Sequence, residues 1–406
     1  MAPRISDHPM GTLIGDPLPG APELAARGST VTGVRTILLT EREQPEVPRG
    51  LQNGKFPVYD RELQIEVWYP ACPDTGTVPA VYTDHIGRAD LGNLVPFLMQ
   101  GRAFRDAEPD SSAGPRPVIV ISHGYPGSRF LLSNLAENLS SKGYVVLSIG
   151  HRDNTYEDFA AERSLESALI HRSRDQRFVI SELERMNRQG FLAGMLQPDN
   201  VGLIGFSMGG YGALRTIGAR FHREAMQQFS SLAEELREAD DFHGIKAVKA
   251  AVLFAPATFW LDENRLEDLD IPTLWVCGTA DHTVHYDAVR CFWQNAVASD
   301  RTLVSYACCG HNVANNPAPR EGLSASWEIY KRWADPVWDT WNLNNANAHF
   351  TTAFFARHLM RRTDVDRYLL PPSPSPERKD AAADLPGFVP GGSAGISLEH
   401  LSGTQG

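Results

Sequence analysis

The sequence feature that most constrains the fold is the stretch VGLIGFSMGGYGAL, residues 201–214, in which an apolar run ends abruptly at a serine. The Val, Leu and Ile residues before Ser207 favour a β-strand, and the residues after it favour a helix. Gly205, Ser207 and Gly209 form the pattern G-x-S-x-G, which is typical of a sharp turn that exposes the serine hydroxyl. A glycine-rich turn with a passive serine is the alternative, but the strand-turn-helix context favours a serine held for chemistry.

Apolar runs alternate with helical patterns through most of the chain, which predicts an α/β fold. The runs lack polar alternation, so they suit strands that are covered on both faces of a mostly parallel, doubly wound sheet. The expected strands of this part are Pro117–Gly124, Gly143–His151, Val201–Ser207, Lys249–Ala257, Ile271–Asp281 and Thr302–Gly310. The expected helices are Ser128–Ser141, about Arg163–Asn187, Met208–Ala219, roughly Tyr286–Ala298 and Asn344–Arg361.

Composition divides the chain into one large domain and two flanking segments. Residues 32–370 form the expected domain, which begins with an antiparallel strand pair, Thr32–Glu41 and Leu63–Ala71. Residues 1–31 are an N-terminal extension, and residues 371–406 are a Pro/Gly-rich C-terminal tail without expected strands. We expect insertions near 82–114 and 221–243 to act as cap-like covers of the carboxyl edge of the sheet.

Charge and cysteine content narrow the function classes. The net charge of −11 makes nucleic acid and anionic membranes poor partners, so neither is expected. The five cysteines are odd in number and lack a C-x-x-C pair, which argues against a disulfide framework or a zinc site. The N-terminus has no apolar core of a secretory signal, and no run is long enough to span a bilayer. The expected location is the cytoplasm.

Downstream of Ser207, an acid and a histidine follow in the order that a hydrolase of this topology requires. Asp281 ends the strand-like run TLWVCGTAD, 74 residues after the serine, and His311 follows the last strand, 30 residues further on. Both lie where parallel strands end, the edge at which sites assemble in open α/β sheets. A serine hydroxyl becomes a nucleophile when an imidazole takes its proton and a carboxylate orients that imidazole. We therefore predict a catalytic Ser207, Asp281 and His311, with Asp153 in the segment GHRDNTYED as the alternative for the acid.

An acyl-transfer site also needs backbone donors for the oxyanion that forms during the reaction. The N–H of Met208, directly after the serine, is one predicted donor. The loop His123–Gly127 supplies the other, for which we choose Tyr125 because Pro126 has no N–H. The His123 ring is expected to brace this loop.

The remaining predictions concern aromatic residues of a substrate pocket and histidines near Asp281. Phe206, beside the serine, and Trp260, after the fourth strand of the alternating part, are the expected walls of a substrate pocket. His282 and His285 flank Asp281 without a compact set of ligands, so no metal site is expected.

The chain resembles the α/β-hydrolase superfamily, and more narrowly the bacterial serine esterases grouped with dienelactone hydrolases and platelet-activating-factor acetylhydrolases. The resemblance covers about Gly33 to Arg361 and is carried by SHGYPGSR, GHRDNTYED, GFSMGGYGA, GTADHTV and GHNVANN. It implies a sheet of about eight strands with helices on both faces, a Ser207–His311–Asp281 triad and no cofactor. Ser207 stands where dienelactone hydrolases have cysteine, and Phe206 where the acetylhydrolases usually have histidine.

The function predicted from these motifs is hydrolysis of a small-molecule carboxylic ester through an acyl-enzyme intermediate. An amidase, peptidase or lactonase would use the same three residues, so these reactions remain alternatives. A non-catalytic binding protein on the same scaffold is disfavoured because all three residues are present. The sequence leaves the natural substrate and the oligomeric state open.

Overall fold

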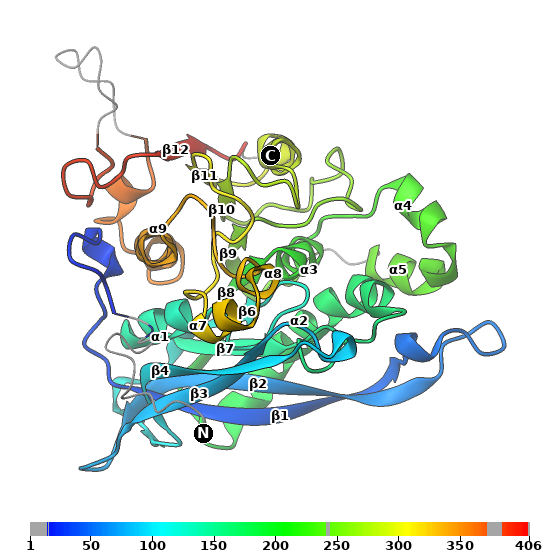
Figure 1. Ribbon diagram of the computed structural model, residues 1–406, viewed down its shortest axis with the longest axis horizontal. Coiled ribbons are helices and arrows are strands. Elements are labelled where there is room, and N and C mark those ends of the chain that lie inside the picture. The colour runs from blue at the N-terminus through cyan, green and yellow to red at the C-terminus, as the bar shows by residue number, and fades with distance from the viewer. Residues whose placement is uncertain (1–13, 15, 241–243, 372–383, 405–406) are drawn as a thin grey trace.

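The computed structural model of the chain describes residues 14, 16–240, 244–371 and 384–404 (Figure 1). Its centre is one mixed sheet of twelve strands in the order β12-β11-β10-β9-β8-β6-β7-β2-β1-β4-β3, with β5 paired to β2. The predicted α/β-hydrolase fold, with a mostly parallel doubly wound sheet, is confirmed. Among the described helices, none is long and apolar enough to cross a membrane.

Six neighbouring strands form the parallel part of the sheet. Their side chains are almost all buried because helices cover both faces, as their unbroken apolar runs predicted. These strands are β6 (Arg116–Ser122), β7 (Val145–Gly150), β8 (Leu196–Phe206), β9 (Val248–Phe254), β10 (Thr273–Gly278) and β11 (Arg301–Tyr306).

Antiparallel strands extend the sheet at both edges. The long strands β1 (Thr32–Pro45) and β2 (Val58–Cys72) pair with each other, and β2 joins the parallel part through β7. Figure 1 shows these two strands on the side of the sheet opposite β12 (Ile396–Leu401), which is an edge strand. The expectation of about eight strands was too low, because it omitted β12, β3 (Pro79–Ile86), β4 (Val95–Arg105) and β5 (Glu108–Pro109).

Helices cover the two faces of the sheet as two packed groups. A Cβ added at Gly202 of β8 would lie 2.6 Å from the Phe355 ring of α9 (Thr340–His358), which contacts α1 (Ser133–Ser141). A Cβ added at Gly205 would instead meet the start of α3 (Met208–Thr216), which contacts α2 (Ser164–Arg188). Residues 202 and 205 point to opposite faces of the strand, so the two groups lie on opposite faces of the sheet.

The segment at 82–114 does not form a separate cap. Most of it belongs to the β3–β4 hairpin and to β5, which continue the sheet beyond β1 and β2. The alternating burial of β3 is typical of an edge strand with one face on the core. The segment at 221–243 contains the short helices α4 (Arg223–Gln228) and α5 (Ala233–Asp240), and residues 241–243 lie outside the described residues.

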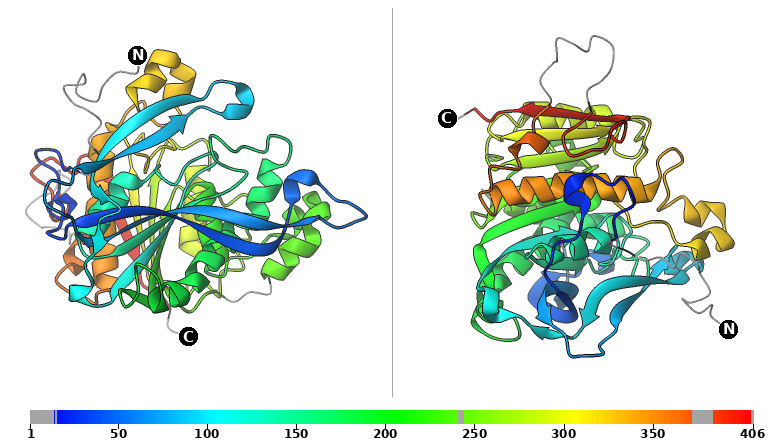
Figure 2. Two further views of the ribbon diagram at one scale, coloured as in Figure 1. Left: turned by 90° about the horizontal axis from the view of Figure 1, so that it is seen from below. Right: turned by 90° about the vertical axis from the view of Figure 1, so that its left-hand side faces the viewer.

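Both flanking segments contact the body of the molecule where they are described. In the N-terminal extension, the Leu24 N–H donates to His349 Nδ1 of α9 at 3.1 Å, and the Gly28 N–H donates to Ser141 Oγ of α1 at 2.9 Å. Figure 2 shows this segment running along α9. In the C-terminal segment, β12 pairs antiparallel with β11 and so belongs to the sheet. Residues 1–13, 15, 372–383 and 405–406 of the two segments lie outside the described residues.

Candidate active site

Ser207 occupies a turn between β8 and α3 that the neighbouring glycines make possible. Its backbone has φ 54° and ψ −115°, a region that residues other than glycine rarely adopt. A Cβ added at Gly205 would lie 2.4 Å from the Gly209 carbonyl oxygen, and one added at Gly209 would lie 2.0 Å from the Ser122 carbonyl oxygen. The strand and the helix can therefore approach this closely only because both positions are glycine.

The strained backbone of Ser207 is held by the neighbouring strand. Its N–H donates to the Phe254 carbonyl at the end of β9, at 2.9 Å, and its carbonyl accepts from the Ala257 N–H at 3.0 Å. These bonds offset the cost of the positive φ, which is about 1–3 kcal/mol for such conformations. The serine side chain is thus fixed at the start of α3.

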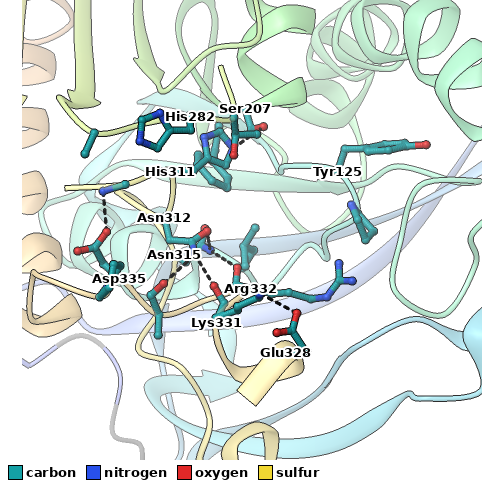
Figure 3. A pocket seen from close by; sticks show the side chains of 18 of the residues that line it. Tyr125, Ser207, His282, His311, Asn312, Asn315, Glu328, Lys331, Arg332 and Asp335 are labelled. Carbon is teal, nitrogen blue, oxygen red and sulfur yellow. Dashed lines mark hydrogen bonds and ion pairs between the residues drawn. The ribbon is translucent and has the colours of Figure 1, made fainter. Parts of the chain in front are cut away.

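His311 lies between the serine and the aspartate, although the three residues come from different loops. His311 Nε2 lies 2.9 Å from Ser207 Oγ (Figure 3), and His311 Nδ1 lies 2.8 Å from Asp281 Oδ2. A neutral imidazole satisfies both contacts when Nδ1–H donates to the carboxylate and Nε2 accepts from the serine hydroxyl. The structure therefore brings together the three side chains that the sequence singled out.

The second carboxylate oxygen of Asp281 is held by its own loop. Oδ1 accepts from the N–H groups of Thr283, at 2.8 Å, and Val284, at 3.1 Å. Burial raises the pKa of Asp281, but the hydrogen bond and charge of His311 and the two amide donors outweigh it and lower the pKa below its usual value. The carboxylate is therefore ionised and oriented toward the imidazole.

The loop that carries His311 is tied to a segment that the sequence analysis did not single out. Asp335 Oδ2 accepts from the Gly310 N–H at 2.7 Å, and Asn312 Nδ2 donates to the Ala334 carbonyl at 2.8 Å. On the other side, the Phe206 ring lies against the His311 ring with 5.2 Å between ring centroids. The imidazole is thus held between the elbow and the segment that precedes α9.

A pocket of about 760 Å³ opens above Ser207 and His311 (Figure 3). One side is formed by the elbow and the Tyr125 loop. The other is formed by α8 (Trp327–Tyr330), which follows the short helix α7 (Arg320–Ala325), and by the residues after α8. Both helices fall between Gly310 and Asn344, where the sequence analysis assigned no element. The spacing of three between Trp327, Tyr330 and Trp333 is a helical signal that would have revealed part of this wall.

The loop predicted to supply an oxyanion donor lies directly against the elbow. A Cβ added at Gly124 would lie 2.9 Å from the Phe206 ring and 3.6 Å from Ser207 Cβ. Tyr125, the next residue, lines the pocket together with Ser207. Met208 is the first residue of α3, so its N–H is one of the amides that a helix leaves without an internal partner.

The two residues predicted to form pocket walls lie in different places. Phe206 lines the pocket, but Trp260 is not among the described residues that line it. The Trp260 indole packs against Tyr211 of α3, Phe229 and Phe259, because the chain after β9 turns across the start of α3. The prediction of Trp260 as a pocket wall therefore needs correction, since the structure makes it part of the packing behind the elbow.

The histidines near Asp281 do not lie in a metal-binding cluster. His282 lines the pocket. Within the described ranges, no group of three or more His, Cys, Asp and Glu side chains is arranged to hold a metal ion.

Two sequence comparisons find similarity to known hydrolases over part of the chain. The family model for platelet-activating factor acetylhydrolase, isoform II, matches residues 105–189. A curated protein of Schizosaccharomyces pombe (strain 972 / ATCC 24843), named "Putative phospholipase A2", is 38% identical over 65 residues, which are 16% of this chain and 14% of that protein. The chain thus matches about one seventh of the length of this relative.

A solved structure matches along nearly the whole chain. The ferulic acid esterase from Streptomyces cinnamoneus superposes with a TM-score of 0.57 and 19% sequence identity, covering 97% of this chain and 100% of that chain. This likeness shows the fold. Together with the two sequence matches, it confirms the resemblance to α/β-hydrolase serine esterases that the motifs indicated.

Proposed function

We propose that the protein is a serine hydrolase that cleaves carboxylic esters, with Ser207 as nucleophile, His311 as general base and Asp281 as the carboxylate that orients it. The observation that carries the proposal is the continuous pair of hydrogen bonds, of 2.9 and 2.8 Å, from the serine through the imidazole to the carboxylate. The hydroxyl stands at the start of a helix and beside an open pocket, so a substrate carbonyl can reach it.

Acylation begins when His311 Nε2 takes the proton of Ser207 and Oγ attacks the ester carbonyl carbon. The electron pair of the carbonyl moves to oxygen, where the N–H groups of Tyr125 and Met208 stabilise the negative charge. When the tetrahedral intermediate collapses, the bond to the alcohol oxygen breaks and His311 gives its proton to the leaving alcohol. The acyl group then remains on Ser207.

Deacylation repeats these steps with water. His311 takes a proton from water, the hydroxide oxygen attacks the acyl carbon, and the second intermediate releases the acid while the proton returns to Ser207 Oγ. During both halves Asp281 stabilises the imidazolium. The amide donors of Thr283 and Val284 hold the carboxylate so that it does not rotate away from Nδ1.

The similarity to esterases favours ester substrates over amides and lactones. The matched family model describes an acetylhydrolase, and the structural neighbour is an esterase. A pocket of about 760 Å³ suits a small-molecule ester, because ligand pockets typically have volumes of about 300–1,000 Å³. No cofactor takes part in the proposed reaction, since all groups it needs are side chains and backbone amides.

The cysteines support a reducing compartment, and we propose that the enzyme acts in the cytoplasm. All five cysteines are free thiols, two of them buried. A protein that matures in an oxidising compartment more often pairs such thiols.

The decisive experiment is covalent labelling with a fluorophosphonate followed by peptide mass spectrometry. We expect one label, on Ser207, and hydrolysis of a short-chain p-nitrophenyl ester that falls by at least about 10⁴-fold in Ser207→Ala. Matched amide and lactone substrates should react more slowly than the ester. Full hydrolysis by Ser207→Ala, or labelling at another residue alone, would contradict the proposal.

A further inference from the structure

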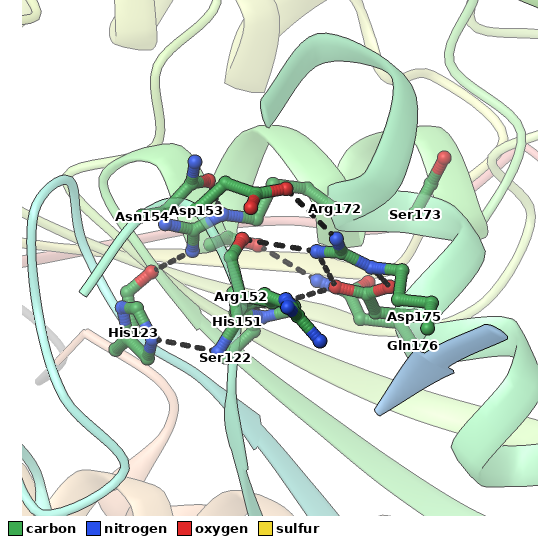
Figure 4. Close-up of polar contacts among 12 residues, drawn as sticks. Ser122, His123, His151, Arg152, Asp153, Asn154, Arg172, Ser173, Asp175 and Gln176 are labelled. Atoms are coloured by element: carbon green, nitrogen blue, oxygen red, sulfur yellow. Dashed lines mark hydrogen bonds and ion pairs between the residues drawn. The ribbon is translucent and has the colours of Figure 1, made fainter. Parts of the chain in front are cut away.

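A buried cluster of charged and polar side chains lies beneath the loop that carries Tyr125 (Figure 4). We refer to it as the buried cluster. Its members come from β2, β6, α2 and the loops that follow β6 and β7, and no more than 6% of any of them is exposed. The buried cluster consists of Arg61, Ser122, His123, His151, Asp153, Asn154, Arg172 and Asp175.

Arg172 of α2 is the member that contacts the loop backbone most directly. Its guanidinium donates to the carbonyl of His123 through Nη1 and to the carbonyl of Gly124 through Nη2, the latter at 2.8 Å. Its Nε donates to Asn154 Oδ1 at 3.0 Å. The planar guanidinium therefore fixes two consecutive carbonyls at once, which a lysine ammonium does less well because it lacks a fixed fork of donors.

The direction of the Gly124 carbonyl determines the direction of the Tyr125 amide. The peptide bond between Gly124 and Tyr125 is trans, so its C=O and N–H point to opposite sides. The carbonyl points into the buried cluster, where it contacts Arg172 at 2.8 Å and His123 Nδ1 at 2.7 Å. The Tyr125 N–H consequently points away from the cluster, and Tyr125 lines the pocket together with Ser207.

The ring of His123 is fixed by a chain of further contacts. His123 Nε2 accepts from the His151 N–H at 3.1 Å, and the His151 ring bridges Ser122 Oγ, at 2.7 Å, and Asp175 Oδ2, at 2.8 Å. Asp175 in turn accepts two hydrogen bonds from Arg61, at 2.8 and 3.1 Å. The loop is thus braced from two directions, by Arg172 and by His123.

The same helix also holds the other predicted donor in place. Gln176, one turn after Arg172, donates to the Gly209 carbonyl at 3.2 Å. Residues four apart lie on the same face of a helix, so this face of α2 contacts both the Tyr125 loop and the first turn of α3. The spacing between the amides of Tyr125 and Met208 is therefore set by one rigid element.

We propose that Arg172 is a positioning residue for the oxyanion hole, because it turns the Gly124–Tyr125 peptide so that the Tyr125 N–H faces the reacting carbonyl. This inference rests on the proposed function. The remaining members of the buried cluster fix the loop but do not contact the substrate.

The test compares an ester with its thionoester in Arg172→Lys. Sulfur is a weaker hydrogen-bond acceptor than oxygen, so a thionoester gains less from the oxyanion donors. We expect kcat for the ester to fall about 30-fold, against a loss of about 10²–10³-fold when a donor is removed entirely. For the thionoester, kcat should fall only about threefold. The ratio of kcat for the ester to kcat for the thionoester should therefore fall about tenfold, while KM changes by less than threefold.

Arg301→Lys is the matched control. Arg301 is also a buried arginine that donates to backbone carbonyls, those of Trp293, Gln294 and Ser299, but it stands at the opposite end of the parallel strands. This variant should unfold more easily yet keep the wild-type ratio of rates. If Arg172→Lys also kept the wild-type ratio, or raised only KM, the inference would be overturned.

Two further measurements keep the test decisive. If Arg172→Lys does not fold, Asn154→Ala removes the acceptor of Arg172 Nε and should lower the ratio about threefold, whereas an unchanged ratio would overturn the inference. Fluorophosphonate labelling of the wild-type protein separates the two proposals. Absence of a label on Ser207 refutes the proposed function, whereas a labelled Ser207 with unchanged ratios refutes only the role of Arg172.

Discussion

Two sets of serine, histidine and aspartate occur at the carboxyl ends of the parallel strands, and their internal geometry is almost the same. In the first, His311 lies 2.9 Å from Ser207 and 2.8 Å from Asp281. In the second, His151 lies 2.7 Å from Ser122 and 2.8 Å from Asp175. Distances alone would therefore rank the second set at least as high as the first.

The surroundings separate the two sets. The side chain of His311 is 18% exposed and lines a pocket, whereas Ser122, His151 and Asp175 are fully buried. Asp281 has no cation other than the imidazole as a partner among the described residues, whereas Asp175 also pairs with the buried Arg61. A substrate can reach the first set only, and the second has the partners of a structural ion-pair network. Access and charge, more than hydrogen-bond distances, thus distinguish a candidate site from a brace.

Apart from removal of the nucleophile, the largest effect is expected at the aspartate of the first set. Asp281→Asn should lower kcat for ester hydrolysis by about 10⁴-fold, because an amide no longer stabilises the imidazolium or selects its tautomer. Cooperative unfolding in urea should persist. Asp287→Asn, at an exposed aspartate of α6 (Tyr286–Asn295), is the control and should retain wild-type kcat. If kcat were the same in the two variants, Asp281 would have no role in the mechanism.

The corresponding change in the second set should act on stability. Asp175→Asn leaves the buried Arg61 with Asp153 as its main charged partner, at 3.0 Å. Removing one partner of a buried ion pair typically costs about 3–5 kcal/mol, so urea denaturation should show a loss of that size in the free energy of unfolding. Asp106→Asn, which breaks the exposed pair with Arg35, should cost less than about 1 kcal/mol. Equal losses in the two variants would show that the buried ion pair contributes no more to stability than the exposed one.

The second set should also make stability depend on pH. Burial, with a further contribution from the charge of Arg172, lowers the pKa of His151 from 6.5 to about 4. The unfolded chain therefore binds a proton at this residue between about pH 6.5 and 4, whereas the folded protein does not. The free energy of unfolding should fall as pH drops through this window, by up to about 3 kcal/mol from this residue. Urea denaturation of His151→Gln should show a smaller decline, and an identical pH dependence would contradict the assignment.

The sequence predicted the first set well because each member is marked locally. Ser207 lies in a glycine-flanked turn, and Asp281 and His311 follow apolar strands, so topology alone places all three at one edge. The buried cluster was largely missed, since Arg61 and Arg172 are separated by more than a hundred residues and neither lies in a motif. The alternation of apolar runs predicted the parallel strands. It did not predict β12, because ISLEHL is short and follows a Pro/Gly-rich stretch, and a strand of this kind is fixed by its pairing with β11.

The smallest effect on turnover is expected for Ser122→Ala. This variant tests the comparison most directly, because the same substitution can be made in both sets. Ser122→Ala leaves His151 Nε2 buried without a partner, which should cost about 1–2 kcal/mol in the free energy of unfolding. Turnover of the ester should fall by no more than about threefold, since His123 and Arg172 still brace the loop. Ser207→Ala should show the reverse, with a loss of turnover of at least about 10⁴-fold and little loss of stability. If the two alanine variants lost turnover equally, burial would not be what separates the sets, and the buried serine would have to be reached by substrate through a motion of the Tyr125 loop.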